Sequence, residues 1–278
     1  MRRPWIKRIA GGAGCYAVLA VLTVAALLPT LWVMISSFKT GAQIFSGSGL
    51  IPRPFTLQGY SDAFGQVHLA RYLLNTALYA VCGSLGALVT GLLAAYPMAR
   101  YHFPGRNALV ASFSLALAIP VVGLATPEFF VVRKLGLFDS QIGFVVFYSA
   151  LFFPLAFVIL RAFLVSLPAE LEEAAIVDGA GYFTIIRKIV VPLTRPALAT
   201  AAVIVFVGIW NEFYFANLLS ASSATENAQI ALASFRSQFN FNVSAMLAGT
   251  TVVMIVPIAL FLLLQRQVIA GLTAGTTK

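Results

Sequence analysis

The sequence of 278 residues is 60% hydrophobic and only 10% charged, with a mean hydropathy of +0.92. A soluble domain carries about 25% charged residues because water must solvate its surface, so this composition excludes a soluble fold and predicts a membrane protein. The net charge of +9 comes from basic residues spread through short connections between apolar runs. That distribution is typical of residues that orient a chain in a bilayer, and it argues against binding to nucleic acid.

Six segments are long and apolar enough to cross a bilayer, which takes roughly 20 residues. They are expected at residues 11–36, 70–98, 107–130, 141–164, 196–219 and 244–266. Because these runs are continuously apolar rather than alternating, they predict helices and not a closed barrel. The first run exceeds the core of a signal peptide and is predicted to be a retained span. Residues 1–278 are therefore expected to form a single all-α transmembrane domain.

Orientation is predicted from the placement of Lys and Arg. With the N-terminus in the cytoplasm, twelve of these residues fall on the cytoplasmic side and six on the other. Arg133 and Lys134 oppose this assignment, but the majority favours both termini in the cytoplasm.

The second predicted span carries a small residue at every fourth position, at Gly83, Ala87, Gly91 and Ala95. Such a smooth helical face allows close approach of another helix. Two partners are open at this point, a helix of the same chain and a helix of a second subunit.

The connection at residues 166–195 is the largest on the predicted cytoplasmic side and the most charged part of the chain. A short helix is expected there, with Ser166 as its N-cap and Pro168 in its first turn. Asp178 and Gly179 are expected to end this helix, because glycine adopts the left-handed conformation that a helix end often needs. A second short helix is expected over residues 182–191, with an apolar side made by Phe183, Ile186, Ile189 and Val190.

Two interpretations of this connection remain open from the residues alone. It is either an amphipathic connector on the membrane surface, or a docking element that presents Ala174, Ala175 and Gly179 to a cytoplasmic partner. In the second case the small residues permit close approach, while Glu173 and Asp178 make the contact polar.

The sequence predicts no metal or nucleotide site of its own. Cys15, Cys82, His68 and His102 are isolated, whereas metal sites need clustered ligands. The one Lys followed by Ser or Thr, Lys39, is not preceded by the glycine-rich turn of a phosphate-binding loop. The chain is therefore not expected to be an enzyme or to bind a cofactor.

Glu212 is interpreted as the one acid well inside an apolar window. A carboxylate in the membrane is costly and points to function. It either lines a translocation path with Asn211 and Asn217, or makes a structural hydrogen bond to a neighbouring helix or subunit. An ion-coupled secondary transporter is the alternative class of protein, but such transporters normally use several intramembrane acids. A membrane enzyme is disfavoured because the two histidines lie on opposite predicted sides.

The residues Glu173-Ala174-Ala175, Gly179, Ile189 and Val191-Pro192 occur at the spacing of the "EAA" loop. This pattern resembles the permease subunits of binding-protein-dependent ABC importers, although that family usually has Leu where Val191 stands. Three further segments are similar to the maltose-type sugar permeases, and specifically to the shorter, six-helix subunit of the pair. They are residues 100–106, residues 210–213 and the C-terminal stretch from Gln265 to Gly275.

The resemblance implies a type I ABC importer permease fold in the cytoplasmic membrane. It implies coupling to an ATPase through seven residues, Glu173, Ala174, Ala175, Asp178, Gly179, Ile189 and Pro192, and tail contacts through Gly271, Leu272, Thr273 and Gly275. The implied partners are a second permease, an ATPase dimer that binds ATP and Mg²⁺, an extracytoplasmic binding protein, membrane lipid and a sugar-like solute.

Overall fold

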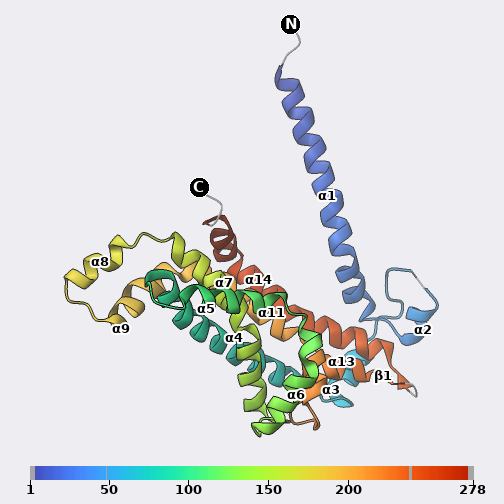
Figure 1. Cartoon of the computed structure of the whole chain (residues 1–278). Coiled ribbons are helices and arrows are strands. Elements are labelled where there is room, and N and C mark those ends of the chain that lie inside the picture. The colour runs from blue at the N-terminus through green and yellow to red at the C-terminus, as the bar shows by residue number, and fades with distance from the viewer. Residues whose placement is uncertain (1–3, 48, 238–239, 275–278) are drawn as a thin grey trace. The chain divides into compact units, whose positions relative to one another are not determined.

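The computed structural model describes residues 4–47, 49–237 and 240–274, with side chains from Gly14 to Arg266 except at positions 48, 171 and 237–240. Most of these residues are helical, which confirms the predicted all-α class (Figure 1). The chain folds as two compact units. The first comprises the residues up to Leu69 together with Leu232–Met254, and the second comprises Ala70–Ala231 together with the residues from Ile255.

The first unit combines a long apolar helix with short helices, a pair of strands and the first part of another candidate span. Its elements are α1 (Pro4–Ser36), α2 (Gly41–Phe45), α3 (Gln58–Gly65), the end of α13 (Ala228–Ser234), the paired strands β1 (Arg236–Ser237) and β2 (Asn240–Phe241), and the start of α14 (Val243–Ala274). The strands are antiparallel, with Arg236 opposite Phe241. The amide of Asn242 ties β2 to α3 by donating to the Asp62 carboxylate over 2.9 Å.

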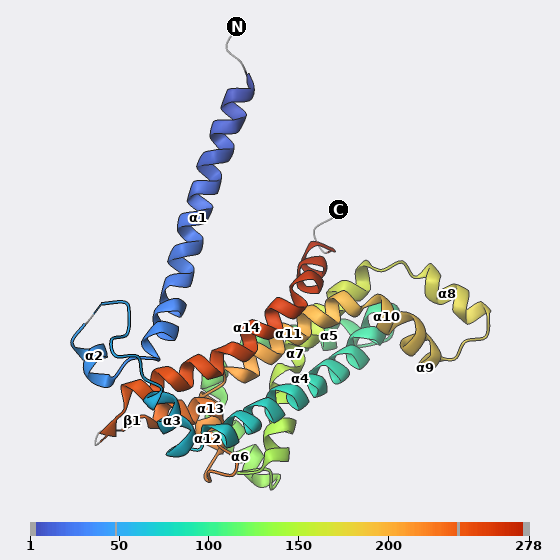
Figure 2. The ribbon, with the colours of Figure 1, turned by 180° about the vertical axis from the view of Figure 1, so that it is seen from behind.

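The second unit is a helical bundle that holds most of the predicted spans. Its helices are α4 (Leu69–Arg100), α5 (Arg106–Leu115), α6 (Ala125–Lys134), α7 (Gln141–Ser166), α8 (Glu170–Val177), α9 (Tyr182–Ile185), α10 (Val191–Leu193), α11 (Arg195–Trp210), α12 (Tyr214–Leu219) and the end of α14. Both views of the ribbon show α4, α7 and α11 side by side, with α8 and α9 beyond one end of them (Figure 2).

Four of the described helices are long and apolar enough to cross a membrane by themselves. They are Gly14–Ser36, Leu69–Arg100, Gln141–Ser166 and Val243–Arg266. Two further segments reach that length only as bent pairs, Arg106–Ala118 with Val121–Lys134 at 101°, and Tyr182–Leu193 with Arg195–Trp210 at 75°. The described chain thus has four to six candidate spans, and six if each bent pair crosses the membrane once.

The segment expected as one span at residues 107–130 is interrupted at Pro120. Helix α5 passes into a 3₁₀ turn at Ala116–Ala118, and a second 3₁₀ turn at Val121–Leu124 leads into α6. Proline lacks the amide hydrogen that a continuous helix needs and pushes the preceding residue into an extended conformation. Ile119 is extended accordingly, with ψ of 126°.

The segment expected at residues 196–219 is also interrupted. Helix α11 ends at Trp210, and α12 begins at Tyr214 after a break of three residues. The apolar composition of this segment did not reveal the break, since nothing but Glu212 disturbs it.

The small-residue face of α4 packs within the chain, which confirms one of the two partners considered for it. A methyl group at Gly91 would lie 3.0 Å from the Cβ atom of Ala156 in α7. One at Gly83 would lie 3.1 Å from the Cβ atom of Tyr148, also in α7. Ala87 and Ala95 are completely buried.

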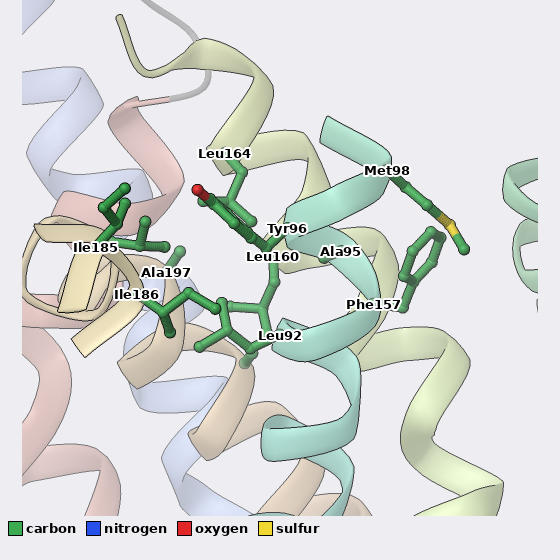
Figure 3. Packing of buried hydrophobic residues seen from close by; sticks show 12 residues of the cluster. Leu92, Ala95, Tyr96, Met98, Phe157, Leu160, Leu164, Ile185, Ile186 and Ala197 are labelled. Carbon is green, nitrogen blue, oxygen red and sulfur yellow. The ribbon is translucent and has the colours of Figure 1, made fainter. Parts of the chain in front are cut away.

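One hydrophobic cluster joins the ends of these helices to the charged loop. Figure 3 shows residues of α4, α7 and α11 in one cluster with Ile185, the last residue of α9, and Ile186, which follows it. The buried members are Leu92, Ala95, Tyr96, Met98, Phe157, Leu160, Leu164, Ile185, Ile186, Val190, Ala197 and Ala201. This cluster fixes where the loop leaves the bundle.

Candidate functional site

The charged loop contains the expected short helix, but that helix begins later than predicted. Ser166 is the last residue of α7, and its hydroxyl donates to the Phe163 carbonyl over 2.7 Å instead of capping a new helix. The prediction of Ser166 as an N-cap is therefore wrong. Leu167 is extended with ψ of 138°, and α8 starts at Glu170 after Pro168 and Ala169. The local sequence permits a helix start after Ser166 or at Glu170. The backbone hydrogen bonding of α7 continues as far as Ser166, so this residue ends α7 instead of capping α8.

The predicted end of this helix is confirmed. Gly179 has φ of +81°, a left-handed conformation that glycine adopts without strain. Its amide donates to the Ile176 carbonyl over 3.0 Å, and the amide of Ala180 donates to the Ala175 carbonyl over 2.9 Å. These two bonds form a Schellman motif, which satisfies the carbonyls that α8 leaves free.

The second short helix is present, but its apolar side differs from the prediction. A π-helical segment, Ile186–Val190, lies between α9 and α10. Because a π turn contains more residues than an α turn, it shifts which side chains share a face. Ile185, Ile186 and Val190 are buried, whereas Phe183 is 80% exposed and does not join them.

The exposed side of α8 presents Glu173, Ala174 and Val177, which helical spacing places together. We call these three residues the docking face. Val177 is 86% exposed, more than any other large hydrophobic side chain among the described residues, and the sequence did not single it out. The available signal was its spacing, four residues after Glu173.

The seven residues that the family resemblance assigns to ATPase coupling fall into two groups. Glu173, Ala174, Asp178 and Gly179 are exposed, whereas Ala175, Ile189 and Pro192 are half-buried. Ala175 packs against the hydrophobic cluster described above. The half-buried residues therefore shape the loop, while the exposed ones are available to a partner.

The opposite side of α8 is tied to the end of α4. The Arg100 Nε atom donates to Glu172 Oε1 over 2.8 Å, the one ion pair among the described side chains. The Tyr96 hydroxyl donates to Glu172 Oε2 over 2.9 Å. Arg100 also donates through Nη1 to the Leu167 carbonyl over 3.1 Å. The sequence did not reveal this contact, because the partner of Glu172 lies 72 residues earlier in the chain.

Glu212 lies at the break between α11 and α12 and organises it. Its carboxylate accepts the amides of Phe215 over 2.8 Å and Ala216 over 2.9 Å, which caps α12. The Tyr148 hydroxyl of α7 donates to the same carboxylate over 2.7 Å. The side chain of Asn227 donates to the Glu212 carbonyl over 2.7 Å. Glu212 therefore makes the hydrogen bond to a neighbouring helix that one interpretation of the sequence required.

Asn211 and Asn217, the two residues grouped with Glu212 as a translocation path, are exposed on either side of it. A second acid, Glu128, lies in the first turn of α6 and near the end of the span expected at residues 107–130, although Glu212 was interpreted as the one acid well inside an apolar window. Glu128 lines an apolar hollow of about 360 Å³ together with Phe147 of α7. Its Oε2 atom is buried with no hydrogen-bond partner among the described groups.

At the other end of the bundle, Asp139 holds the connection that follows α12. Its Oδ1 atom accepts hydrogen bonds from the hydroxyl of Thr225, from the amide of Ala221 over 3.0 Å, and from the amide and hydroxyl of Ser222 over 3.1 Å each. Burial alone would raise the pKa of Asp139, but these hydrogen bonds hold that pKa below the ordinary carboxyl value. The fold therefore stabilises the ionised form of Asp139.

Polar side chains at the start of α4 bind the same connection. Asn75 donates to the carbonyls of Ala224 and Glu226 over 2.9 and 2.8 Å. The amide of Gln141, at the start of α7, donates to Asn75 Oδ1 over 2.9 Å. The starts of α4 and α7 thus meet at this end of the bundle, and their last turns meet at the end that carries α8.

The predicted tail contacts lie outside the described part of the molecule. Gly271, Leu272 and Thr273 are within the backbone of α14, but their side chains are not among those described. Gly275 lies beyond the described residues.

A bundle of apolar helices with four to six candidate spans defines a multi-pass membrane protein. The chain belongs to the family of binding-protein-dependent transport system inner membrane components, whose model matches residues 87–273. It is therefore a multi-pass inner-membrane protein, and the resemblance inferred from the EAA loop is confirmed.

The comparisons with individual proteins agree with this family. The chain is 38% identical to the trehalose transport system permease protein SugB of Mycobacterium tuberculosis (strain CDC 1551 / Oshkosh), over 95% of this chain and 97% of the relative. It is 32% identical to the sulfoquinovosyl glycerol transport system permease protein SmoH of Agrobacterium fabrum (strain C58 / ATCC 33970), over 93% and 91%.

Among solved structures, a chain of a bacterial ABC transporter involved in the import of the acidic polysaccharide alginate superposes with a TM-score of 0.79 at 22% identity. The superposition covers 96% of this chain and 99% of that one. This likeness establishes the ABC importer permease fold.

Proposed function

We propose that this chain is one of two permease subunits of an ABC importer and that it forms, with its sister permease, the pathway for a sugar or sugar-like solute. The observation that carries the proposal is the docking face. It exposes Val177 beside Ala174 on a helix at the end of a membrane bundle, in a chain of this family. The names of SugB and SmoH, which refer to trehalose and sulfoquinovosyl glycerol, support the solute class. The family and the ABC importer permease fold, rather than the number of intramembrane acids, argue against an ion-coupled secondary transporter.

The proposed partners are the sister permease, an ATPase dimer and an extracytoplasmic binding protein. ATP and Mg²⁺ would bind the ATPase subunits, and this chain contributes no cofactor. One solved structure with the same fold is described as an alginate ABC transporter in complex with a pentasaccharide-bound periplasmic protein, which supports the kind of assembly. The docking face, Asp178 and Gly179 would contact the ATPase, and Gly271, Leu272, Thr273 and Gly275 would add contacts from the tail.

In the proposed mechanism, closure of the ATPase dimer moves α8, and the attached spans rock between inward-open and outward-open states. Alternating access of this kind moves helical bundles as nearly rigid bodies around a central site. Two of the spans contain a break, one between α5 and α6 and one between α11 and α12. Neither of these spans would move as a single straight helix.

We place Asn211, Glu212 and Asn217 on the translocation path within this proposal. Glu212→Ala removes the cap of α12 and the bond to Tyr148, and we expect a loss of about 3 kcal/mol of stability together with lower uptake. Glu212→Gln retains an acceptor for one amide and for Tyr148 and is expected to lose less of both. Normal uptake and normal complex assembly in Glu212→Ala would show that Glu212 has neither a transport nor a structural role.

The experiment that tests the proposed function is affinity purification of the tagged chain in mild detergent. We expect a second permease and an ATPase dimer in the eluate, and the binding protein when solute is present. As a control, a variant with Val177→Glu and Ala174→Glu should retain the sister permease and lose the ATPase. Recovery of the ATPase with that variant, or its absence from the unmodified complex, would contradict the proposal.

A further inference from the structure

Glu172 differs from the other acids of α8 in its environment. Glu170 and Glu173 are exposed, whereas Glu172 is 7% exposed and lies on the side of α8 that faces the bundle. Both of its oxygens are occupied, one by Arg100 over 2.8 Å and the other by Tyr96 over 2.9 Å. Both donors belong to the last turns of α4, so a single carboxylate connects α8 to a membrane span.

The backbone on either side of α8 does not continue the helix into the bundle. Leu167 is extended before it, and Gly179 is left-handed after it. A helix between two such turns can change its direction by small rotations at either turn, so its backbone alone transmits little displacement to the spans. Side-chain ties must therefore carry that displacement.

The two hydrogen bonds of Glu172 have the geometry needed to transmit a displacement of α8 to α4. Charge-assisted hydrogen bonds are short and directional, and two of them on one carboxylate fix its position. Arg100 also binds the Leu167 carbonyl at the end of α7, so the same guanidinium holds both ends of the link between α7 and α8. Tyr96 is 2% exposed within the hydrophobic cluster, which keeps its hydroxyl in place (Figure 3).

We propose that Glu172 is a positioning residue that couples displacement of α8 to α4 through Arg100 and Tyr96. This inference rests on the proposed function and adds the route by which movement of the ATPase reaches the membrane spans. The Arg100 Nη2 atom is buried with no acceptor among the described groups. Buried ion pairs stabilise little more than apolar packing does, so the main effect of this one is to fix the register of α8 against α4.

The first test compares four variants of the complete complex in proteoliposomes. They are Glu172→Ala, Glu172→Gln, Tyr96→Phe and the matched control Glu170→Gln. Uptake of solute per ATP hydrolysed is measured with the loaded binding protein present. We expect Glu172→Ala to lower this ratio at least about fivefold, the lower end of typical coupling between linked sites. Glu172→Gln and Tyr96→Phe should have smaller effects, and Glu170→Gln none.

A second measurement reports geometry rather than activity. Spin labels are placed at Glu170→Cys and Leu93→Cys, both exposed positions, after replacement of Cys15 and Cys82 by Ser. We expect the distance between the labels to stay the same with and without ATP in the otherwise unmodified chain. In Glu172→Ala the distance distribution should broaden and become ATP-dependent.

The outcomes separate this inference from the proposed function. An unchanged uptake ratio and an unchanged distance distribution in an assembled Glu172→Ala complex would overturn the coupling role alone. Loss of the ATPase from the unmodified complex would overturn the proposed function and the coupling role together. If the Glu172→Ala complex does not assemble, the uptake ratio and the label distance are measured in Tyr96→Phe instead, because this variant keeps the ring in the cluster and removes only one hydrogen bond. Unchanged values in Tyr96→Phe would then overturn the coupling role.

Discussion

At the scale of single residues, polar side chains in this chain act mainly by fixing the backbone of another segment. Asp139 holds the connection after α12, Glu212 caps α12, and Glu172 binds the last turns of α4. A polar group that the fold removes from water needs a hydrogen-bond partner in compensation. Their positions therefore mark the places where the fold is specified by hydrogen bonding rather than by packing.

Substitution of Gly179 should act first through the backbone conformation, because an added side chain meets no other part of this chain. An added Cβ atom would meet nothing within 4 Å, but φ is +81°. A left-handed conformation costs most residues about 1–2 kcal/mol, and asparagine adopts it more readily. We expect Gly179→Val to disturb the end of α8 and to lower uptake per ATP, whereas Gly179→Asn should keep the end of α8 and lose less uptake per ATP. Equal transport by the two variants in proteoliposomes would contradict this account.

Asp139 should make its connection sensitive to acid. Its folded-state pKa is depressed, so the stabilisation is present above the unfolded value of about 4 and is lost as the pH falls through the lower folded value. We expect the amides of Ala221 and Ser222 to be protected from hydrogen exchange near neutral pH and to lose protection in that acid range. Asp139→Asn should remove most of the pH dependence; an unchanged profile in this variant would assign the protection to other groups.

At the scale of elements, close helix contact and helix breaks have different origins. The contact of α4 with α7 follows from the small residues at four-residue spacing, which the sequence makes visible. The breaks in the third and fifth spans follow from Pro120 and from the capping of α12 by Glu212. A hydropathy window averages over both breaks and so reports one continuous span in each case.

The tight contact of α4 with α7 predicts a penalty for added volume. Gly91→Val should push α4 away from Ala156 and the backbone of Phe157, at a cost of about 1–3 kcal/mol. The matched control is Gly123→Val, since Gly123 has no neighbouring atom within 4 Å of an added Cβ. The apparent melting temperature of the purified protein in detergent should fall for Gly91→Val only. A similar fall in both variants would mean that the contact is looser than the structure indicates.

At the scale of the whole molecule, the two ends of the second unit separate the connections into two sets. The starts of α4 and α7 meet the connection after α12, and their last turns meet the loop that contains α8. This alternation agrees with the predicted order of spans. The excess of Lys and Arg then assigns the α8 end to the cytoplasm, which remains a prediction.

Cysteine labelling tests that assignment. In a chain without Cys15 and Cys82, Ser223→Cys and Lys188→Cys place one thiol at each end, both at exposed positions. A membrane-impermeant maleimide added to intact spheroplasts should label Ser223→Cys and spare Lys188→Cys. Both should react after the membrane is permeabilised. The reverse labelling pattern would mean that the chain has the opposite orientation in the membrane. It would exclude α8 as a site for a cytoplasmic ATPase.

The sequence by itself determined the membrane class, the approximate positions of six apolar segments and the location of the charged loop that contains α8. These features depend on composition, on hydrophobic run length and on local spacing, all of which are properties of neighbouring residues. It also located the end of α8, because Gly179 is a local signal for a left-handed turn. The family assignment came from spacing within the loop and was confirmed.

Only the tertiary structure decided which side of α8 is buried, which acids are bound and where two spans break. Arg100 and Glu172 are 72 residues apart, and Tyr148 and Glu212 are 64 apart, so no local pattern predicts these pairs. The phase shift caused by the π-helical segment also depends on how Ile185, Ile186 and Val190 pack in the cluster. Contacts between distant residues are set by the packing of whole helices, and that packing is absent from any short stretch of sequence.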